Sequence, residues 1–178
     1  MSSDMDLDEL KDFFDNANDL IQSINRDGSV RYVNAKWKEV MGYSDEEIGD
    51  LNLRDFIRAD LIPHCEYIFE QIKTMESLEN IDVVFITKYG KEVYLKGNVN
   101  SRFIDGKFHS TRGIFRDVTA DNNLKKNLEE LRNIINNSQM VAFTWKSEKN
   151  WPVEFVTENV KRFFGYSRED FLSGMVSY

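Results

Sequence analysis

The residues that could act as nucleophiles or metal ligands are few in this chain. It holds one cysteine, Cys65, and two histidines, His64 and His109, which leave no set of ligands for a tetrahedral metal site. The sequence suggests no Ser-His-Asp or Cys-His pairing and no glycine loop that could cradle a phosphate. Gly42-Tyr43-Ser44 is typical of a turn between helices, unlike the Gly-x-Ser-x-Gly elbow of hydrolases. We therefore expect neither a metal site nor an enzyme activity in this stretch.

A second set of residues suits an apolar pocket rather than catalysis. Between Ile81 and Val118 one face of each expected strand is apolar, as in strands with one buried side. Core packing accounts for most of these residues, but Gly97 and Gly113 stand out, because a glycine inside a strand often marks the close approach of another group. We expect a pocket for a small apolar or aromatic ligand, lined by Leu53, Phe56, Ile68, Ile72, Phe85, Leu95, Gly97, Val99, Thr111, Gly113 and Phe115.

An internal repeat shows how the chain is organised. The stretch from Val30 to Glu46 returns from Val153 to Glu169, with a constant offset of 123 positions. A period of that length indicates tandem domains rather than a solenoid. The second copy reaches the end of the sequence before it can repeat the sheet that follows in the first. We expect one complete module at residues 15–119 and the front of a second at residues 136–178.

Composition and charge exclude several classes of partner. The net charge is −8, and the basic residues are interleaved with acids, so no concentrated basic surface is available for nucleic acid. No run approaches the roughly 20 apolar residues that cross a bilayer, and the acidic N-terminus is not a secretory signal. A single cysteine fits a reducing compartment. These features predict a cytoplasmic location without nucleic acid or membrane contact by this stretch.

Periodicity and turn residues predict the elements of the first module. Residues 1–14 carry a short amphipathic helix, and strands at 20–25 and 30–34 flank an Asp27-Gly28 turn. Helical spacing then continues from Ala35 to Lys73, interrupted by a glycine stop at Gly42 and a capping box at Ser44. Three strands joined by two short hairpins complete the module.

The segment at residues 120–135 is predicted to be a linker helix. Leu124, Leu128, Leu131 and Ile135 are spaced 4, 3 and 4 apart, which is the seam of a heptad repeat. Two readings stay open from the pattern alone. The stripe could be a dimer seam, or it could fold back onto the sheet of its own module.

The order of these elements resembles that of a PAS domain. Three motifs carry the resemblance: Gly42–Glu47 after the second strand, the Tyr89–Glu92 hairpin, and Arg116–Thr119, which is similar to the family's Asp-Ile/Val-Thr signature. The resemblance covers residues 10–119, and the front of a second PAS domain covers residues 133–178. It implies an α+β fold in which a five-stranded antiparallel sheet carries short helices on one face.

The resemblance leaves the cofactor unknown, because PAS modules hold haem, flavin, a small metabolite or nothing. Flavin-adduct PAS domains carry a reactive cysteine in an Asn-Cys-Arg stretch, where this chain has Asn52-Leu53-Arg54. In place of the polar groups around the flavin it offers Phe85, Leu95 and Phe115. His64 stands at the start of the long helix, where a surface position is expected rather than a haem ligand. We expect neither a cysteinyl-flavin adduct nor haem.

The resemblance implies a sensory role in a larger signalling protein. Asp117 and Thr119 would pass a change in the sheet to the linker helix, and a homodimer would form through that helix and the PAS surface. The parent expected first is a two-component sensor histidine kinase, although no kinase or cyclase motif lies in this sequence. The alternative is a ligand-free dimerisation scaffold of a cyclic-dinucleotide or other signalling protein.

The unfinished second copy has a physical consequence. Its apolar residues would lack the three-stranded sheet that should cover them, so we expect loose packing or cover borrowed from elsewhere. These residues are Trp145, Phe155, Phe163, Phe164 and Phe171.

Overall fold

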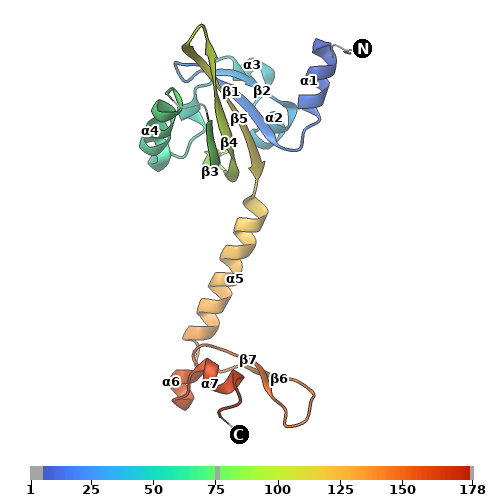
Figure 1. The fold of residues 1–178 in the computed structure, drawn as a ribbon, viewed down its shortest axis with the longest axis vertical. Helices are drawn as coiled ribbons and strands as arrows, with labels where there is room; N and C mark the ends of the chain where they lie inside the picture. Colours follow the sequence, from blue (N-terminus) through green and yellow to red (C-terminus); the bar gives the residue numbers. More distant parts are fainter. Residues whose placement is uncertain (1–5, 75–76, 177–178) are drawn as a thin grey trace. The chain divides into compact units, whose positions relative to one another are not determined.

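The computed structural model describes residues 6–74 and 77–176, and Figure 1 shows its fold. Residues 1–5 of the predicted N-terminal helix and residues 177–178 of the predicted second copy lie outside the described residues. The chain divides into two compact units between Ala120 and Asp121.

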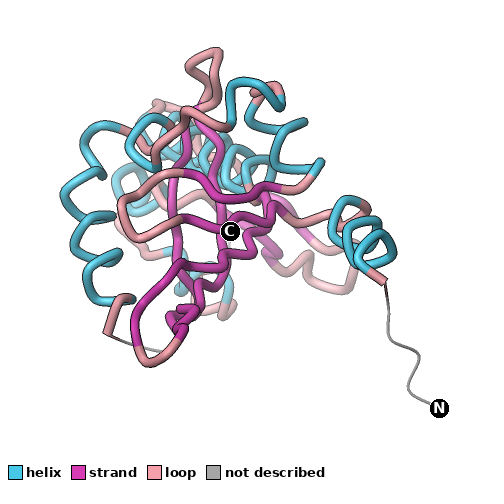
Figure 2. Tube along the Cα trace, turned by 90° about the horizontal axis from the view of Figure 1, so that it is seen from above, coloured by secondary structure: helices cyan, strands magenta, loops and turns pink. Residues whose placement is uncertain are grey.

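In the first unit a helix and two strands come first, several short helices follow, and three strands come before the last helix. This order was expected from the sequence. Figure 2 shows the helices in cyan and the strands in magenta. The strands are β1 (Leu20–Ile24), β2 (Val30–Val33), β3 (Ser77–Ile86), β4 (Glu92–Ile104) and β5 (Lys107–Asp117). The helices are α1 (Leu7–Asp15), α2 (Ala35–Met41), α3 (Asp45–Ile48), the 3-10 turns η1 (Leu53–Asp55) and η2 (Ala59–Leu61), α4 (Ile62–Ile72) and α5 (Thr119–Asn137), of which α5 continues into the second unit.

The five strands form one antiparallel sheet in the order β2-β1-β5-β4-β3. This sheet and its short helices confirm the α+β fold predicted from the sequence. Strand β5 lies in the middle, where Phe115 is opposite Leu20 on one side and Gly97 on the other. The tight turns use left-handed backbone, at Gly28 (φ +88°) between β1 and β2 and at Asp105 (φ +49°) between β4 and β5.

A chain of aromatic rings runs through the core between the sheet and the helices. Trp37 of α2 meets Phe56 edge to face at 5.3 Å, and Phe56 meets Phe85 of β3 at 4.9 Å. Phe85 in turn meets Phe115 of β5 at 5.7 Å. All four rings are buried. Such pairs add about 0.5–1.5 kcal/mol each beyond their burial, so this chain binds the helical layer to the centre of the sheet.

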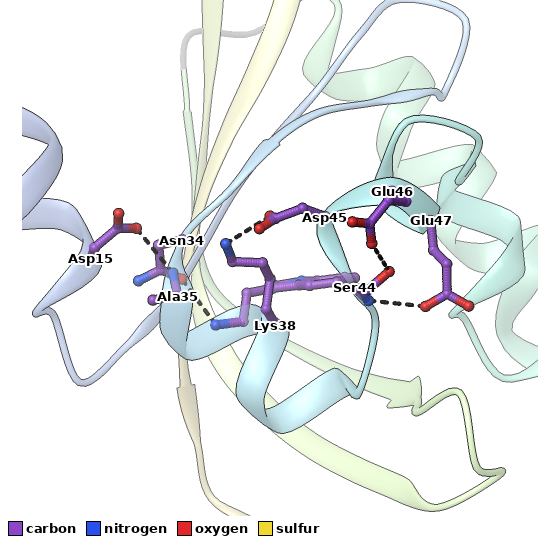
Figure 3. A network of polar contacts seen from close by, with 9 residues as sticks. Asp15, Asn34, Ala35, Lys38, Ser44, Asp45, Glu46 and Glu47 are labelled. Atoms are coloured by element: carbon purple, nitrogen blue, oxygen red, sulfur yellow. Dashed lines mark hydrogen bonds and ion pairs between the residues drawn. The ribbon is translucent and has the colours of Figure 1, made fainter.

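Asn34 joins three elements at the start of the module, and it lies beside α1 and α2 in Figure 3. Its side-chain oxygen accepts from the backbone N–H groups of Ile21 and Trp37, each at 3.0 Å. Its side-chain nitrogen donates to the carbonyl oxygens of Phe14 (2.9 Å) and Asp19 (3.0 Å). This buried amide therefore ties the end of α1 to β1 and caps α2.

The Gly42–Glu47 motif ends one helix and starts the next, as predicted. Gly42 ends α2 with a left-handed φ of +80°, which a residue with a Cβ rarely adopts. The Ser44 N–H donates to Glu47 at 2.9 Å, and the Ser44 hydroxyl donates to Glu46 at 2.7 Å. Figure 3 shows these contacts beside the ion pair between Lys38 and Asp45. The motif thus reverses the chain between two short helices.

The second unit contains the hairpin β6 (Phe143–Trp145) and β7 (Val153–Val156), followed by α6 (Val160–Phe164) and α7 (Arg168–Leu172). Strand β7 lies 123 positions after β2, and Gly165 ends α6 with φ +81° as Gly42 ends α2. Asn159 donates to the carbonyl oxygens of Ile135 (3.1 Å) and Met140 (2.8 Å). The local structure of the first copy therefore recurs, with Asn159 in a role similar to that of Asn34.

The second unit has only a small apolar core of its own. The buried residues are Val153, Val156, Val160 and Phe171. The expectation for Phe171 was therefore wrong, because the hairpin and α6 already cover its ring. The other four aromatic residues that were expected to lack cover are each at least 42% exposed: Trp145, Phe155, Phe163 and Phe164.

Candidate functional site

A small apolar cavity of about 80 Å³ lies between the sheet and α4. Its walls come from η1, α4 and strands β1, β3, β4 and β5. Apolar side chains dominate the lining, which includes Ile24, Ile57, Ile68, Phe69 and Ile72. A cavity of this volume holds roughly five water-sized groups, which suits a very small molecule.

A wider polar groove of about 750 Å³ lies outside this cavity. Leu53, Ile57, Cys65 and Phe69 line both spaces, so the groove forms the approach to the cavity. The charged residues of the groove carry both signs: Arg26, Asp27, Arg54, Asp55, Glu66, Glu70 and Lys73. The groove therefore has a polar mouth above an apolar interior.

An ion pair connects the two walls of the groove. Arg54 of η1 lies 2.5 Å from Glu66 of α4, and both side chains are largely exposed. Exposed pairs of this kind contribute about 0–1 kcal/mol, so the contact can open at little cost. Nearby, the side-chain hydroxyl and backbone N–H of Ser29 donate to Asp27 and lower the pKa of that carboxyl.

Cys65 stands on the wall that the groove and the cavity share. Burial raises the pKa of its thiol above the usual value, because an apolar surrounding disfavours the thiolate. The thiol is therefore protonated at neutral pH and behaves as a small apolar side chain. It belongs to α4 and faces the Asn52-Leu53-Arg54 stretch across the same groove.

The structure brings together seven of the eleven residues predicted for the pocket. These seven line the cavity: Leu53, Ile68, Ile72, Phe85, Val99, Thr111 and Phe115. Phe56 and Leu95 lie instead in the closed core, where Phe56 fills the space between Trp37 and Phe85. Their apolar character placed them on the correct face but could not tell a core position from a cavity position.

The two strand glycines do not leave free space for a ligand. A Cβ at Gly97 would lie 2.8 Å from both Cα and Cδ1 of Phe115, and a Cβ at Gly113 would lie 2.6 Å from the ring of the same Phe115. The expectation that these glycines open the pocket is therefore corrected. They make room for the Phe115 side chain, and Phe115 itself lines the cavity.

Three polar residues that were not predicted for the pocket also line the cavity: Gln22, His64 and Asp82. Gln22 occupies an inward position of β1 between the buried Leu20 and Ile24, and its polar side chain in an apolar alternation was the available signal. His64 is exposed, yet it also lines the cavity. His109 lies on β5, with its Nδ1 3.4 Å from the Ser110 hydroxyl. Within residues 6–74 and 77–176, no group of three or more His, Cys, Asp or Glu residues could hold a metal ion.

Hydrogen bonds join the first residue of α5 to the sheet. The Tyr94 N–H of β4 donates to the Thr119 hydroxyl at 2.9 Å, and the Val118 N–H donates to the Tyr94 carbonyl at 2.9 Å. The Thr119 N–H donates to the Asp117 carboxylate at 2.8 Å. Asp117 thus accepts from the first N–H group of the helix, whereas the Thr119 hydroxyl accepts from the neighbouring strand β4. Strand β4 connects this junction to the cavity, where Val99 is part of the lining.

Comparison with known families gives a match over most of the first unit. The family described as PAS domain matches residues 18–120. This chain belongs to the PAS domain family. The match starts after α1 and ends at the junction between β5 and α5. A second PAS domain at residues 136–178 stays a prediction.

Solved structures share the PAS fold at low sequence identity. A PAS domain from Colwellia psychrerythraea is 16% identical, with a TM-score of 0.58 over 64% of this chain and 98% of that one. A PAS domain from a two-component sensor histidine kinase is 15% identical, with a TM-score of 0.54 over 65% of this chain and 99% of that one. These likenesses show the fold alone.

A curated relative is closer in sequence over a short stretch. The "Methyl sulfide methyltransferase-associated sensor" of Methanosarcina acetivorans is 47% identical over 49 residues. That stretch is 28% of this chain and 5% of the relative's length. The matched stretch therefore corresponds to a small part of that sensor, and the similarity supports a sensory PAS domain.

The predicted dimer seam of the PAS linker helix is exposed. Exposure of Leu124, Leu128, Leu131 and Ile135 ranges from 43% to 60%. Within the second unit, Leu128, Leu131 and Ile135 line a groove of about 570 Å³ that Phe155 and Val156 of β7 also line. Leu124 lies outside that groove.

None of the helices in the described part of the chain is long and apolar enough to cross a membrane.

Proposed function

We propose that this chain is the sensory part of a larger signal-transduction protein, with a two-component sensor histidine kinase as the first candidate. A small molecule would enter the cavity of the PAS domain, and the sheet would carry the change to α5. The chain itself would bind and transmit without catalysing a reaction. Its acidic surface and single cysteine suit a cytoplasmic setting.

The observation that supports this proposal is the path from cavity to helix along β4. Val99 lines the cavity, and Tyr94, five positions earlier on the same strand, uses both its N–H and its carbonyl to hold Val118 and Thr119. A shift of β4 at Val99 would act on the start of α5 through these bonds. Similarity to a PAS domain of a sensor histidine kinase supports the choice of parent.

The exposed stripe of α5 favours a second candidate, a ligand-free dimerisation scaffold. Native mass spectrometry of the purified chain, together with a visible absorbance scan, separates the two. A retained small molecule or chromophore supports sensing. A cavity that retains nothing, and that binds nothing from a library of small neutral molecules, supports the scaffold instead.

The junction can be tested by replacing Thr119 with valine. Thr119→Val removes the acceptor of the Tyr94 N–H but leaves Asp117 in place. One hydrogen bond contributes about 0.5–1.5 kcal/mol, so amide exchange in the first turn of α5 should become about 3- to 10-fold faster. Hydrogen exchange followed by NMR measures this rate.

Thr74→Val is the matched control, since the hydroxyl of Thr74 is exposed and donates only to its local Gln71 carbonyl. This control should leave exchange at α5 unchanged. Equal exchange in Thr119→Val and the parent chain would show that the Tyr94–Thr119 bond does not hold the helix start.

We also propose that the chain forms a homodimer through α5. Leu124→Asp combined with Leu128→Asp would place charges in an apolar seam, and association should weaken at least about 100-fold. Light scattering coupled to size-exclusion chromatography should then report the mass of one chain. The single variant Leu124→Asp changes a residue outside the groove that β7 lines. Its effect on the mass is therefore separate from any disturbance of the packing around β7.

Ile134→Asp serves as the control for the seam. Ile134 is 66% exposed on the same helix but lies outside the 4-3-4 spacing, so this variant should stay dimeric. An unchanged mass for the Leu124 and Leu128 variants would exclude α5 as the dimer seam.

A further inference from the structure

Two polar groups inside the apolar cavity are left without a protein partner. Gln22 and Thr111 line the cavity and are only 5% and 3% exposed. No hydrogen bond from a described residue reaches the Gln22 side-chain nitrogen or the Thr111 hydroxyl. Neither atom is among the fully buried side-chain atoms without a hydrogen bond in the described residues, so both keep surface that is accessible from the cavity. Each can therefore form a hydrogen bond to a molecule inside the cavity.

The orientation of the Gln22 amide follows from its neighbour. The Trp37 ring N–H donates to the Gln22 side-chain oxygen at 3.0 Å, within the buried core. Because an indole N–H can only donate, the atom that it meets must be the oxygen of the amide. The NH₂ group of Gln22 is therefore the end left free to donate.

The sheet register places the second polar group close to the first. Gln22 of β1 lies opposite Gly113 of β5, and Thr111 is two positions away on the same face of β5. Diagonal neighbours of this kind lie roughly 7–8 Å apart, so one atom between them can contact both side chains. The Ser23 hydroxyl, which donates to the Thr111 carbonyl at 2.7 Å, holds the two strands together at this point.

The charges around the cavity restrict what can bind there. No Lys or Arg is among the described lining residues, and the ionisable His64 and Asp82 are exposed. A carboxylate would lose its hydration without meeting a buried cation, and an ammonium would meet no buried anion. Neutral molecules avoid both costs.

We propose that Gln22 and Thr111 form a hydrogen-bonding pair that selects a small neutral molecule with one acceptor atom on an otherwise apolar body. This inference rests on the proposed sensory function, because it names the ligand class of the same cavity. The Gln22 NH₂ and the Thr111 hydroxyl would donate to the acceptor. The apolar side chains would enclose the rest of the molecule, whose size is limited by the volume of about 80 Å³.

Thiazole and thiophene are suitable probes, since both are small neutral five-membered rings and only thiazole carries a nitrogen acceptor. In the intact ¹⁵N-labelled chain, thiazole should shift the side-chain NH₂ resonance of Gln22, and thiophene should leave it nearly unmoved. Thr111→Val keeps the shape of the side chain and removes its donor. It should raise the Kd for thiazole about 3- to 10-fold and leave the Kd for thiophene unchanged.

Thr87→Val is the matched control, because Thr87 is equally buried, accepts from the Lys91 N–H, and lies outside the cavity lining. It should change neither Kd. Parallel changes for both rings in Thr111→Val, with no thiazole-specific shift at Gln22, would overturn the polar pair but leave small-molecule binding intact. If neither ring perturbs the lining residues at millimolar concentration, both the pair and the sensory cavity are contradicted. The Gln22 resonance in the unmodified chain gives the answer even if Thr111→Val fails to fold.

Discussion

Gly97→Ala should destabilise the first unit by about 3 kcal/mol, although it adds only one methyl group. The new Cβ would lie 2.0 Å from the backbone oxygen of Ile114 and 2.8 Å from Cα of Phe115. Both atoms belong to the central strand β5, which is held on both sides and cannot move away cheaply. Urea unfolding followed by circular dichroism measures the loss.

Gly49→Ala is the control for this substitution. A Cβ at Gly49 would meet nothing within 4 Å, and the residue has an ordinary φ of −60°, so the free energy of unfolding should change by less than about 0.5 kcal/mol. A stable Gly97→Ala variant that no longer binds thiazole would restore the idea that Gly97 leaves space for a ligand. A destabilised one supports the structural role of Gly97 beside Phe115.

Trp37→Ala should cost about 3–5 kcal/mol of unfolding free energy in the same unit. The Trp37 ring is fully buried, contacts Phe56 and Tyr43, and supplies the hydrogen bond that orients Gln22. Its removal opens a cavity and leaves the Gln22 oxygen without its donor. Urea unfolding followed by far-ultraviolet circular dichroism measures the loss without depending on tryptophan fluorescence.

Trp151→Ala provides a tryptophan control of equal chemistry. Trp151 is 61% exposed in the second unit, so the cost should stay below about 1 kcal/mol. Trp37→Phe separates the two contributions of Trp37, since it keeps most of the ring packing and removes the N–H. If Trp37→Ala were as stable as Trp151→Ala, the aromatic chain through the core would not contribute as described.

Local signals account for the parts of the fold that the sequence predicted. Asp27-Gly28 and Asp105-Gly106 mark hairpins because few residues tolerate left-handed backbone, and Gly42 ends a helix for the same reason. Alternation along β3, β4 and β5 identified the buried face of the sheet. These patterns depend on neighbours in sequence, so they could be read before the tertiary structure was known.

The candidate site was predicted less completely, for a physical reason. Apolar alternation marks Leu95 and Val99 equally as inward residues, yet only Val99 lines the cavity, because its partners from α4 leave room there. Gly97 and Gly113 suggested space, but the ring of Phe115 turns back over both. Which inward side chain meets a void depends on the rotamers and sizes of residues far away in the chain.

By itself the sequence determined the order of elements, the linker helix, predicted at residues 120–135 and observed at Thr119–Asn137, and the repeat at an offset of 123. These follow from local periodicity, turn chemistry and self-similarity, and short motifs carried the resemblance to the PAS family. The tertiary structure decided that Trp37 orients Gln22, that Thr111 lies diagonally across from it, and that Thr119 bonds to β4 rather than to its own helix. These features join segments up to tens of residues apart. They depend on sheet register and side-chain packing, which no local pattern contains.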